Sequence, residues 1–397
     1  MPRFEPFQAL RYRRNVDLHD VCSPPYDVLS DLDRLALATA HANNIVHIDM
    51  PLASSGNAYE HAAVVLNQWI TEGVLVRDDQ PSFTLYRMKF TDTTGKARNV
   101  VGVIGALEVV DEGAGGVLPH ERTTPKAKTD RLELTRATDA NLSPVWGLSL
   151  ATGLSTLLTE PAELLGELTD DLGVVHSVER VTDDAHIAAI SAAIAAHPVV
   201  IADGHHRYAI SRTYRDEVRE RTNSTSTGAE LTMTYVNELI DEQLSVAAIH
   251  RLYEGITYKE LAAALSPFFT INDADPVGPS TLSQMNERGS LCLVAKTGRT
   301  HWLTPIAEKF AGVRNLDSAY LEHALSSVQH EVRYQHGVTE VQHELSTSDA
   351  ATAILIRPVS VAEIQHTANE GLLMPPKSTF FSPKLRTGFV LREMKTR

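Results

Sequence analysis

Cysteine is scarce in this chain: among 397 residues, only Cys22 and Cys292 are present. Two cysteines are too few for a disulfide framework or for a zinc site built on cysteine, and they fit a reducing compartment. No apolar stretch is long enough to span a bilayer, and residues 1–14 mix charges with no apolar region behind them. The sequence therefore predicts a cytoplasmic protein that is neither exported nor embedded in a membrane.

Basic residues are also in the minority, with 36 Lys plus Arg against 50 Asp plus Glu and a net charge of −14. A surface that follows nucleic acid needs a basic excess or a basic stripe, and the sequence has neither. It also lacks a Walker-type loop, a dinucleotide fingerprint and a nucleophile elbow. These absences exclude a general nucleic-acid binder. Any phosphate chemistry must use a phosphate-binding motif of another kind.

The remaining composition is that of a globular protein, because 43% of the residues are hydrophobic and 22% are charged. Helical and strand patterns alternate, which predicts a mixed α/β fold of the α+β type. A chain of this length predicts two domains. The polar stretch 221–230 is the best candidate boundary and gives domains 1–225 and 226–397, although a surface loop inside one domain explains it equally well.

Hydrophobic periodicity and helix-capping residues predict the main elements. Helices are expected at 30–43, 59–74, 183–197, 205–221, 257–269, 316–328 and 361–369. Strands are expected at 83–90, 100–110, 199–202 and 352–356, with a hairpin at 291–302 around Thr297 and Gly298.

The strongest local feature is the segment VVIADGHHRY at 199–208. A buried strand that leads through a glycine turn into a helix directs free backbone N–H groups and the positive end of the helix dipole to one spot, which suits an anion. The candidate residues are Asp203, Gly204, His205, His206 and Arg207. Asp203 repels a phosphate unless it holds a metal, accepts a proton or orients a histidine. The alternative is an ordinary helix start, with Asp203 as its N-cap and structural histidines.

Two further segments concentrate cations in this acidic chain. The first, at 118–131, contains His120, Glu121, Lys126 and Arg131. It predicts a positive field for an anionic substrate, with His120 or Glu121 as a base or metal ligand, whereas a solvated helix face with salt bridges is the alternative.

The second segment, at 374–386, holds prolines that fix an extended path, together with lysines, Ser378 and Thr379. Lys377 and Ser378 are its candidate phosphate ligands. A rigid C-terminal loop against the first domain explains the same residues without a ligand. Near the N-terminus, two prolines stiffen a loop that presents Tyr26 and Asp27, or they form a turn capped by Asp27.

Five segments in this order, SPPYDV, LPHERTTPKAKTDR, RATDANLSPVW, IADGHHRYA and MPPKSTFFSPKL, resemble the bacterial family known as domain of unknown function 1015. Within it, ADGHHRYA is similar to the phosphate-binding box of the ParB/sulfiredoxin-like fold, which also hosts free L-serine kinases. The resemblance implies a ParB/sulfiredoxin-like core with a second α/β domain whose last loop returns to the site. The chain departs from ParB proteins in lacking a basic DNA-binding region.

The resemblance implies a phosphotransferase that moves phosphate from ATP, ADP or pyrophosphate to a small-molecule hydroxyl, with free L-serine as the expected acceptor and Mg²⁺ as the expected cofactor. Gly204, His205, His206 and Arg207 would bind the donor phosphates, and Asp203 would lie beside Mg²⁺ or the acceptor hydroxyl. The base would be Glu121 or His120, and His206 is a further catalytic candidate. Lys126, Arg131, Lys377 and Ser378 are the additional phosphate ligands.

Two alternatives remain open at this point. One is a metal-dependent phosphohydrolase that uses these histidines and carboxylates to activate water, and the other is a nucleotide sensor without catalysis. No nucleic-acid or membrane partner is expected, and the sequence does not determine the oligomeric state.

Overall fold

The computed structural model describes residues 1–52, 56–92, 95–121 and 128–395. The chain divides into two compact units: the first comprises Met1–Ser245 and Pro383–Arg397, and the second comprises Val246–Ser382. This division differs from the expected boundary at 225, because the polar stretch leads directly into a central strand of the first unit's sheet. The stretch is therefore a loop within one unit, which is the alternative given above.

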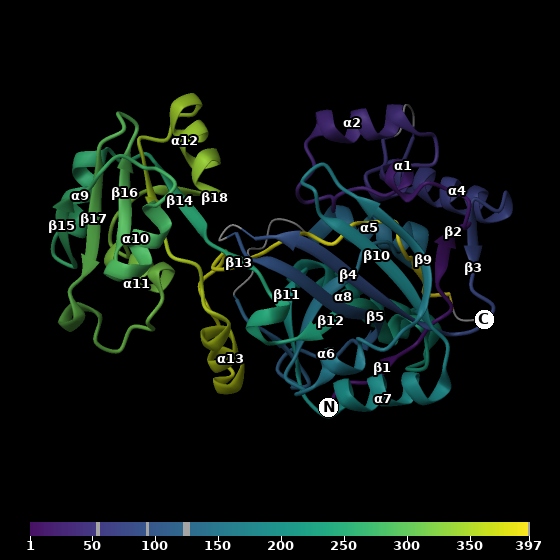
Figure 1. The fold of residues 1–397 in the computed structure, drawn as a ribbon. Coiled ribbons are helices and arrows are strands. Elements are labelled where there is room, and N and C mark those ends of the chain that lie inside the picture. The colour runs from purple at the N-terminus through teal and green to yellow at the C-terminus, as the bar shows by residue number, and fades with distance from the viewer. Residues whose placement is uncertain (53–55, 93–94, 122–127, 396–397) are drawn as a thin grey trace. The chain divides into compact units, whose positions relative to one another are not determined.

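A large mixed sheet forms the frame of the first unit (Figure 1). Its strands follow the order β6-β11-β8-β12-β5-β4-β10-β9, with β1 paired to β5. Neighbours are antiparallel except for β6 with β11 and β8 with β12, which are parallel. The strands are β1 (Phe4–Glu5), β4 (Phe83–Thr91), β5 (Ala97–Glu108), β6 (Val117–Pro119), β8 (Val145–Ser149), β9 (Glu163–Thr169), β10 (Val175–Val181), β11 (Val199–Asp203) and β12 (Leu231–Glu238). Two short pairs join β2 (Leu10–Tyr12) to β3 (Leu75–Arg77) and β7 (Ala140–Asn141) to β21 (Arg392–Glu393).

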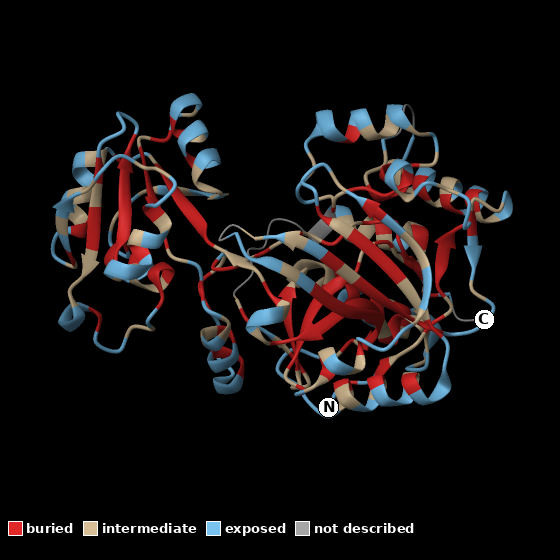
Figure 2. Cartoon of the chain, in the orientation of Figure 1, coloured by how far each residue is buried: buried red, intermediate tan, exposed pale blue. Residues whose placement is uncertain are grey.

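Helix α7 covers part of the sheet with its apolar side. Ile190 and Ile194 of α7 belong to the same buried cluster as Val199, Ile201 and other strand residues. Figure 2 shows the strands mainly buried and the outer sides of the helices exposed. The helices are α1 (Leu18–Val21), α2 (Asp31–Ala40), α3 (Val46–Asp49), α4 (Ala58–Thr71), α5 (Lys128–Thr138), α6 (Leu154–Leu157), α7 (Asp184–Ala195) and α8 (His205–Thr222).

The second unit is built on an antiparallel sheet with the order β15-β17-β16-β19-β14-β18. Alternate residues of its strands enter two different cores: Leu291 and Leu293 belong to one cluster, and Cys292 and Val294 belong to the other. This period of two is what a sheet covered on both faces requires. The strands are β14 (Ile249–Glu254), β15 (Phe269–Asp273), β16 (Leu291–Ala295), β17 (Thr300–Pro305), β18 (Glu331–His336) and β19 (Thr352–Leu355), besides the pair β13 (Val246–Ala247) and β20 (Phe380–Phe381).

Helices supply further side chains to both cores of the second unit. Leu261 of α9 and Leu321 of α11 pack in one cluster, and Met285 of α10 and Val341 of α12 pack in the other. The helices are α9 (Tyr258–Leu265), α10 (Thr281–Arg288), α11 (Asp317–Ala324), α12 (Val338–Thr347) and α13 (Val361–Glu370).

The predicted mixed α/β class is confirmed, and the helices expected at 30–43 and 183–197 are α2 and α7. Ser30 caps α2 with a full capping box, and Asp183 caps α7. The predicted hairpin is β16 and β17, and Gly371 ends α13 in the left-handed conformation. Both cysteines are free and buried. Within the described ranges, no helix is long and apolar enough to cross a membrane.

Candidate functional site

The turn between β11 and α8 has the predicted strand–glycine–helix form. Gly204 is the N-cap of α8 and has φ +83°, which favours glycine. Its carbonyl accepts the Tyr208 N–H at 2.9 Å, so the helix begins directly behind the turn. A Cβ at this position would lie 2.9 Å from Nε of Arg207, so any other residue would force the guanidinium to shift.

Asp203, the last residue of β11, holds two cations. Its Oδ2 accepts from Nζ of Lys384 at 3.0 Å and from Nη2 of Arg207 at 3.3 Å. Burial alone would raise the pKa of this carboxyl, but Lys384 and Arg207 hold it well below its usual range. Asp203 is therefore ionised and a weak base, and its clearest role is to position the two cations.

Two hydrogen bonds hold the Arg207 side chain, and one of its nitrogens can still donate a hydrogen bond. Its Nη1 donates to the carbonyl of Pro144, and its Nη2 donates to Asp203. Its Nε is buried and has no hydrogen-bond partner among the described residues. Arg207 and Lys384 thus place two cations at the start of an 18-residue helix, where the helix dipole also favours an anionic ligand.

His120 lies at the same edge of the sheet, because it follows β6 and β6 runs parallel to β11. Its Nδ1 contacts the carbonyl of Ile201, which can only accept, so Nδ1 carries the proton and Nε2 carries the lone pair. Nε2 lies 3.9 Å from Oε2 of Glu121, and the ring centroid lies 4.9 Å from that of His205. Burial lowers the pKa of His120 to about 4, so its imidazole is neutral at pH 7.

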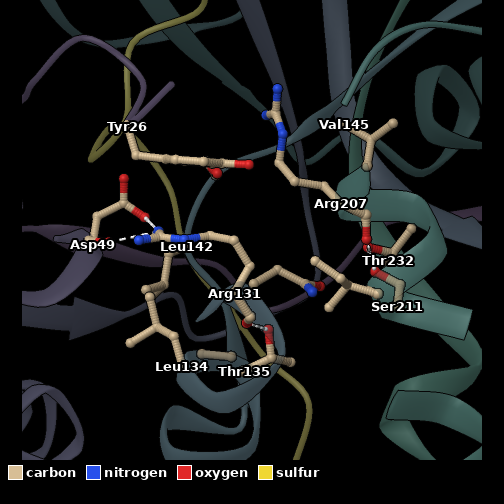
Figure 3. Close-up of a pocket in the computed structure, with 14 residues that line it drawn as sticks. Tyr26, Asp49, Arg131, Leu134, Thr135, Leu142, Val145, Arg207, Ser211 and Thr232 are labelled. Carbon is tan, nitrogen blue, oxygen red and sulfur yellow. Dashed lines mark hydrogen bonds and ion pairs between the residues drawn. The ribbon is translucent and has the colours of Figure 1, made fainter. Parts of the chain in front are cut away.

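A pocket adjoins this turn and shares Arg207 with it (Figure 3). It holds about 460 Å³ of empty space, part of which is open to solvent. Arg131 lies between two lining residues: its guanidinium carbon is 4.1 Å from the centroid of the Tyr26 ring, and its Nη1 donates to Oδ1 of Asp49 at 3.1 Å. The full lining consists of Tyr26, Asp49, Arg131, Leu134, Thr135, Ala140, Asn141, Leu142, Ser143, Val145, Arg207, Ile210, Ser211 and Thr232.

Asp49 is the unexpected member of this lining. Its side chain is only 3% exposed, and Oδ2 has no hydrogen-bond partner among the residues that the structure describes. Burial raises the pKa of this carboxyl, although Arg131 and Arg207 lower it in part. The pocket thus combines two arginines with one incompletely satisfied carboxylate.

A family model described as "Protein of unknown function (DUF1015)" matches residues 4–319. The chain belongs to this family. The match includes the β11–α8 turn and Arg131, whereas Lys384 lies beyond it.

Among solved structures, a conserved hypothetical protein from Pyrococcus furiosus has a TM-score of 0.38 and 11% identity, covering 69% of this chain and 92% of its own. A free serine kinase in complex with AMP has a TM-score of 0.39 and 12% identity, covering 70% and 88%. SbnI with a C-terminal truncation, from Staphylococcus aureus, has a TM-score of 0.39 and 13% identity, covering 72% and 85%. Scores this low support no conclusion about ligand or reaction. A search of the curated proteins gives no match.

In this DUF1015 chain, the structure brings together most of the predicted site residues. Asp203, Gly204 and Arg207 form the turn, and His120, Glu121 and His205 lie next to one another. Arg131 lines the same pocket as Arg207. His206 is half-buried at the start of α8.

The remaining predicted phosphate ligands are Ser378, Lys377 and Lys126. Ser378 belongs to the second unit, where its hydroxyl donates to the Pro375 carbonyl at 2.7 Å and lies 3.0 Å from Oγ of Ser318. Lys377, in the same unit, accepts from Arg251 through its backbone carbonyl at 3.0 Å. Neither residue lines the pocket. Lys126 lies outside the described residues.

Sequence reasoning missed Lys384, Tyr26 and Asp49 as site residues. Lys384 and Tyr26 lie in segments already singled out, MPPKSTFFSPKL and SPPYDV, but other residues of the first segment were chosen and Tyr26 received no role. Asp49 ends a short apolar helix, and no feature of the sequence distinguishes it from a structural residue.

A metal would find few protein ligands here. Within the described part of the chain, no three His, Cys, Asp or Glu side chains are arranged to hold a metal ion. Mg²⁺ is commonly held by one or two carboxylates together with substrate phosphates. Asp203 fits that mode as a single carboxylate.

Proposed function

We propose that this chain is a phosphotransferase that binds the phosphates of ATP, ADP or pyrophosphate at the β11–α8 turn and transfers one phosphoryl group to the hydroxyl of a small molecule. The single observation that carries the proposal is the pair of cations, Arg207 and Lys384, held on Asp203 at the beginning of α8. Free L-serine is the first acceptor to test, because of the resemblance of ADGHHRYA to the phosphate-binding box.

The proposed division of work follows from the charges. Phosphoryl transfer needs in-line positioning and neutralisation of charge on the phosphate oxygens. Arg207 has a buried Nε that is still available for an oxygen, and Lys384 adds a point charge beside it. Mg²⁺, when bound by Asp203 and the donor phosphates, would supply further charge neutralisation.

The acceptor hydroxyl also needs a group that takes its proton. Asp203 is unsuited, because its pKa lies well below the usual range. Burial lowers the pKa of His120 to about 4, so this imidazole is also a weak base. Glu121, whose Oε2 lies 3.9 Å from Nε2 of His120, is therefore the first of the two proposed bases to test, and His120 is the second.

The first experiment offers purified protein ATP, ADP or pyrophosphate with MgCl₂ and L-serine, followed by ³¹P NMR. Formation of phosphoserine supports the proposal. Phosphate release without an acceptor would indicate a hydrolase, and a nucleotide-dependent rise in Tm without any product would indicate a sensor. Either result would overturn the proposal.

Arg207→Ala tests the site itself. Hydrogen bonds from a charged donor contribute about 1.5–3 kcal/mol, so we expect donor binding to weaken by roughly 10-fold to 150-fold in calorimetry. Arg212→Ala is the matched control on the same helix, because Arg212 contacts the Val110 carbonyl and Glu112 and does not line the pocket. Equal donor binding by wild type and Arg207→Ala would count against the site.

A further inference from the structure

The first unit has a second cavity, which lies between the β2–β3 pair and strands β9 and β10 (Figure 1). It holds about 980 Å³ of empty space, part of which is open to solvent. All of its lining residues belong to the first unit, and none of them lines the pocket of Figure 3. The lining consists of Arg11, Tyr12, Arg13, Arg14, Leu18, Val76, Arg77, Asp78, Asp79, Leu165, Val178, Arg180 and Phe389.

The lining carries an excess of positive charge, although the chain as a whole is acidic. Five arginines line the cavity against two aspartates. Outside the lining, Glu163 pairs with Arg14 and Arg180. Glu393 pairs with Arg77. These two glutamates still leave the arginines one positive charge in excess, so the cavity favours an anion.

Arg11 is the buried cation of this cavity, because its side chain is only 9% exposed. Its Nε donates to Oδ2 of Asp78 at 3.0 Å, and its Nη2 donates to Oγ1 of Thr84 at 2.6 Å. Its Nη1 is shielded from solvent and has no hydrogen-bond partner among the described residues. Burial lowers the pKa of this guanidinium, and Asp78 offsets the effect only in part. An anionic oxygen at Nη1 would supply the missing acceptor and further offset the burial of the charge.

Arg13 follows β2 and adds a second available guanidinium. It is exposed, and it makes no ion pair with any residue that the structure describes. Arginine donates to phosphate and carboxylate oxygens in a fixed fork geometry, so two guanidinia of one cavity suit either oxyanion.

Another part of the lining is apolar. The pairing of β9 with β10 shifts at Val178, which leaves Leu165 as an extra residue of β9. Both residues line the cavity, and Phe389 of the C-terminal segment lines it as well. A bare inorganic ion would leave this apolar surface in contact with water, so the ligand that fits best also has an apolar part.

We propose that this cavity binds a small organic anion, whose phosphate or carboxylate oxygens accept from Arg11 and Arg13 and whose apolar part lies against Val178 and Phe389. An oxygen reaches Nη1 of Arg11 only after a side chain of the lining shifts, because this atom is shielded from solvent. The site is separate from the β11–α8 turn, and it does not depend on the proposed phosphotransferase.

The test is calorimetry on the full-length chain. Phenyl phosphate and phenylacetate are the anionic probes, phenol lacks the charge, and inorganic phosphate lacks the apolar part. We expect at least one anionic probe to bind about 10-fold or more tightly than phenol and inorganic phosphate. The comparison of the two anionic probes shows whether the site prefers phosphate or carboxylate. Failure of both to bind, or equal binding of phenol, overturns the proposal.

Two variants locate the binding. Arg11→Lys keeps a cation for Asp78 but removes Nη1, so the anionic probe should bind about 10-fold or more weakly. Arg13→Gln should also weaken binding, without a change in Tm, and it decides the question if Arg11→Lys does not fold. Arg3→Gln is the matched control, because Arg3 is an exposed arginine that contacts Glu108 and does not line the cavity. Equal affinities in Arg13→Gln and Arg3→Gln would contradict the proposal.

Arg207→Ala separates this cavity from the β11–α8 turn. Binding of the anionic probe should persist in Arg207→Ala, which is expected to weaken binding of the phosphate donor. Loss of probe binding in Arg207→Ala, together with full binding in Arg13→Gln, would place the probe at the turn and overturn the proposal. The formation of phosphoserine tests the phosphotransferase by itself, so either proposal can fail while the other stands.

Discussion

Both units place an arginine–aspartate pair at the beginning of a helix, and the two pairs differ in what they leave unsatisfied. In the second unit, Arg357 donates from Nε and Nη2 to Asp317, which also accepts the backbone N–H of Arg357 at 2.8 Å. In the first unit, Arg207 shares Asp203 with Lys384 and keeps a buried Nε without a partner among the described residues. The Arg357–Asp317 pair of the second unit is satisfied without a ligand, whereas the Arg207–Asp203 pair of the first unit would be stabilised by one.

Two buried histidines also differ between the units. His250 of the second unit accepts the Ile356 N–H on Nδ1 at 3.2 Å, so its proton is on Nε2. His120 of the first unit donates from Nδ1 to the Ile201 carbonyl, so its proton is on Nδ1. Burial keeps both histidines neutral at pH 7, but the backbone around each ring selects the opposite tautomer.

Acid should lower the free energy of unfolding of both units, and this is the largest change in stability that we predict. Burial lowers the pKa of His120 and of His250 to about 4, from about 6.5 in an unfolded chain. Between these values the unfolded state binds more protons, so stability is full above pH 6.5 and is lost as the pH falls toward 4, by roughly 3 kcal/mol for each histidine. Chemical denaturation across this pH range measures the loss.

The variants His120→Asn and His250→Asn separate the contributions of the two histidines to the pH dependence of stability. Asparagine can replace the hydrogen bond of Nδ1 in each case. Each variant should remove its own part of the acid dependence. Only His120→Asn should also change turnover by the proposed phosphotransferase. A change in turnover of similar size in His250→Asn would contradict the distinction between the units.

Arg357→Ala should cost stability without affecting ligand binding. The side chain of Asp317 is 3% exposed. Removal of the Arg357 guanidinium would leave this buried carboxylate with fewer hydrogen-bond donors. Since Arg357 itself is one-quarter exposed, we expect a loss of about 2 kcal/mol in denaturation of the full chain. Arg207→Ala should weaken binding of the phosphate donor with little loss of stability, because Lys384 still neutralises Asp203. Similar losses of donor binding in both variants would contradict the distinction between the two pairs.

Two glycines provide the smallest and most closely matched test. Gly204 has φ +83° and Gly371 has φ +65°, so alanine at either position should cost about 1 kcal/mol. A Cβ at Gly204 also collides with Arg207, whereas at Gly371 nothing lies within 4 Å. Donor binding measured by calorimetry should therefore fall in Gly204→Ala and remain unchanged in Gly371→Ala. Equal affinities in the two variants would show that the position of Arg207 is unimportant.

Local patterns predicted much of this fold, because capping and periodicity act over a few residues. The Ser30 cap, the 291–302 hairpin and the 199–208 turn are examples. The boundary between the units was not predictable from the polar stretch, because whether β12 joins the first sheet depends on its pairing with β5 and β8, which are distant in sequence.

The sequence predicts the candidate-site residues that lie within one segment. It does not predict the residues that only the tertiary structure brings to the site. Asp203, Gly204 and Arg207 lie within one turn, so their proximity follows from the chain itself. Lys384 reaches Asp203 across 181 positions, and Asp49 meets Arg131 across 82. Neither pairing leaves a periodic signal in the sequence.

The return of residues 383–397 to the first unit sets an order in biosynthesis. Asp203 and Arg207 leave the ribosome long before Lys384, and the entire second unit is translated between them. A nascent chain thus carries an incomplete anion site until residues 383–397 dock on the first unit. Translation that stops within the second unit would yield a protein without Lys384, so the proposed reaction would require synthesis to continue beyond that unit.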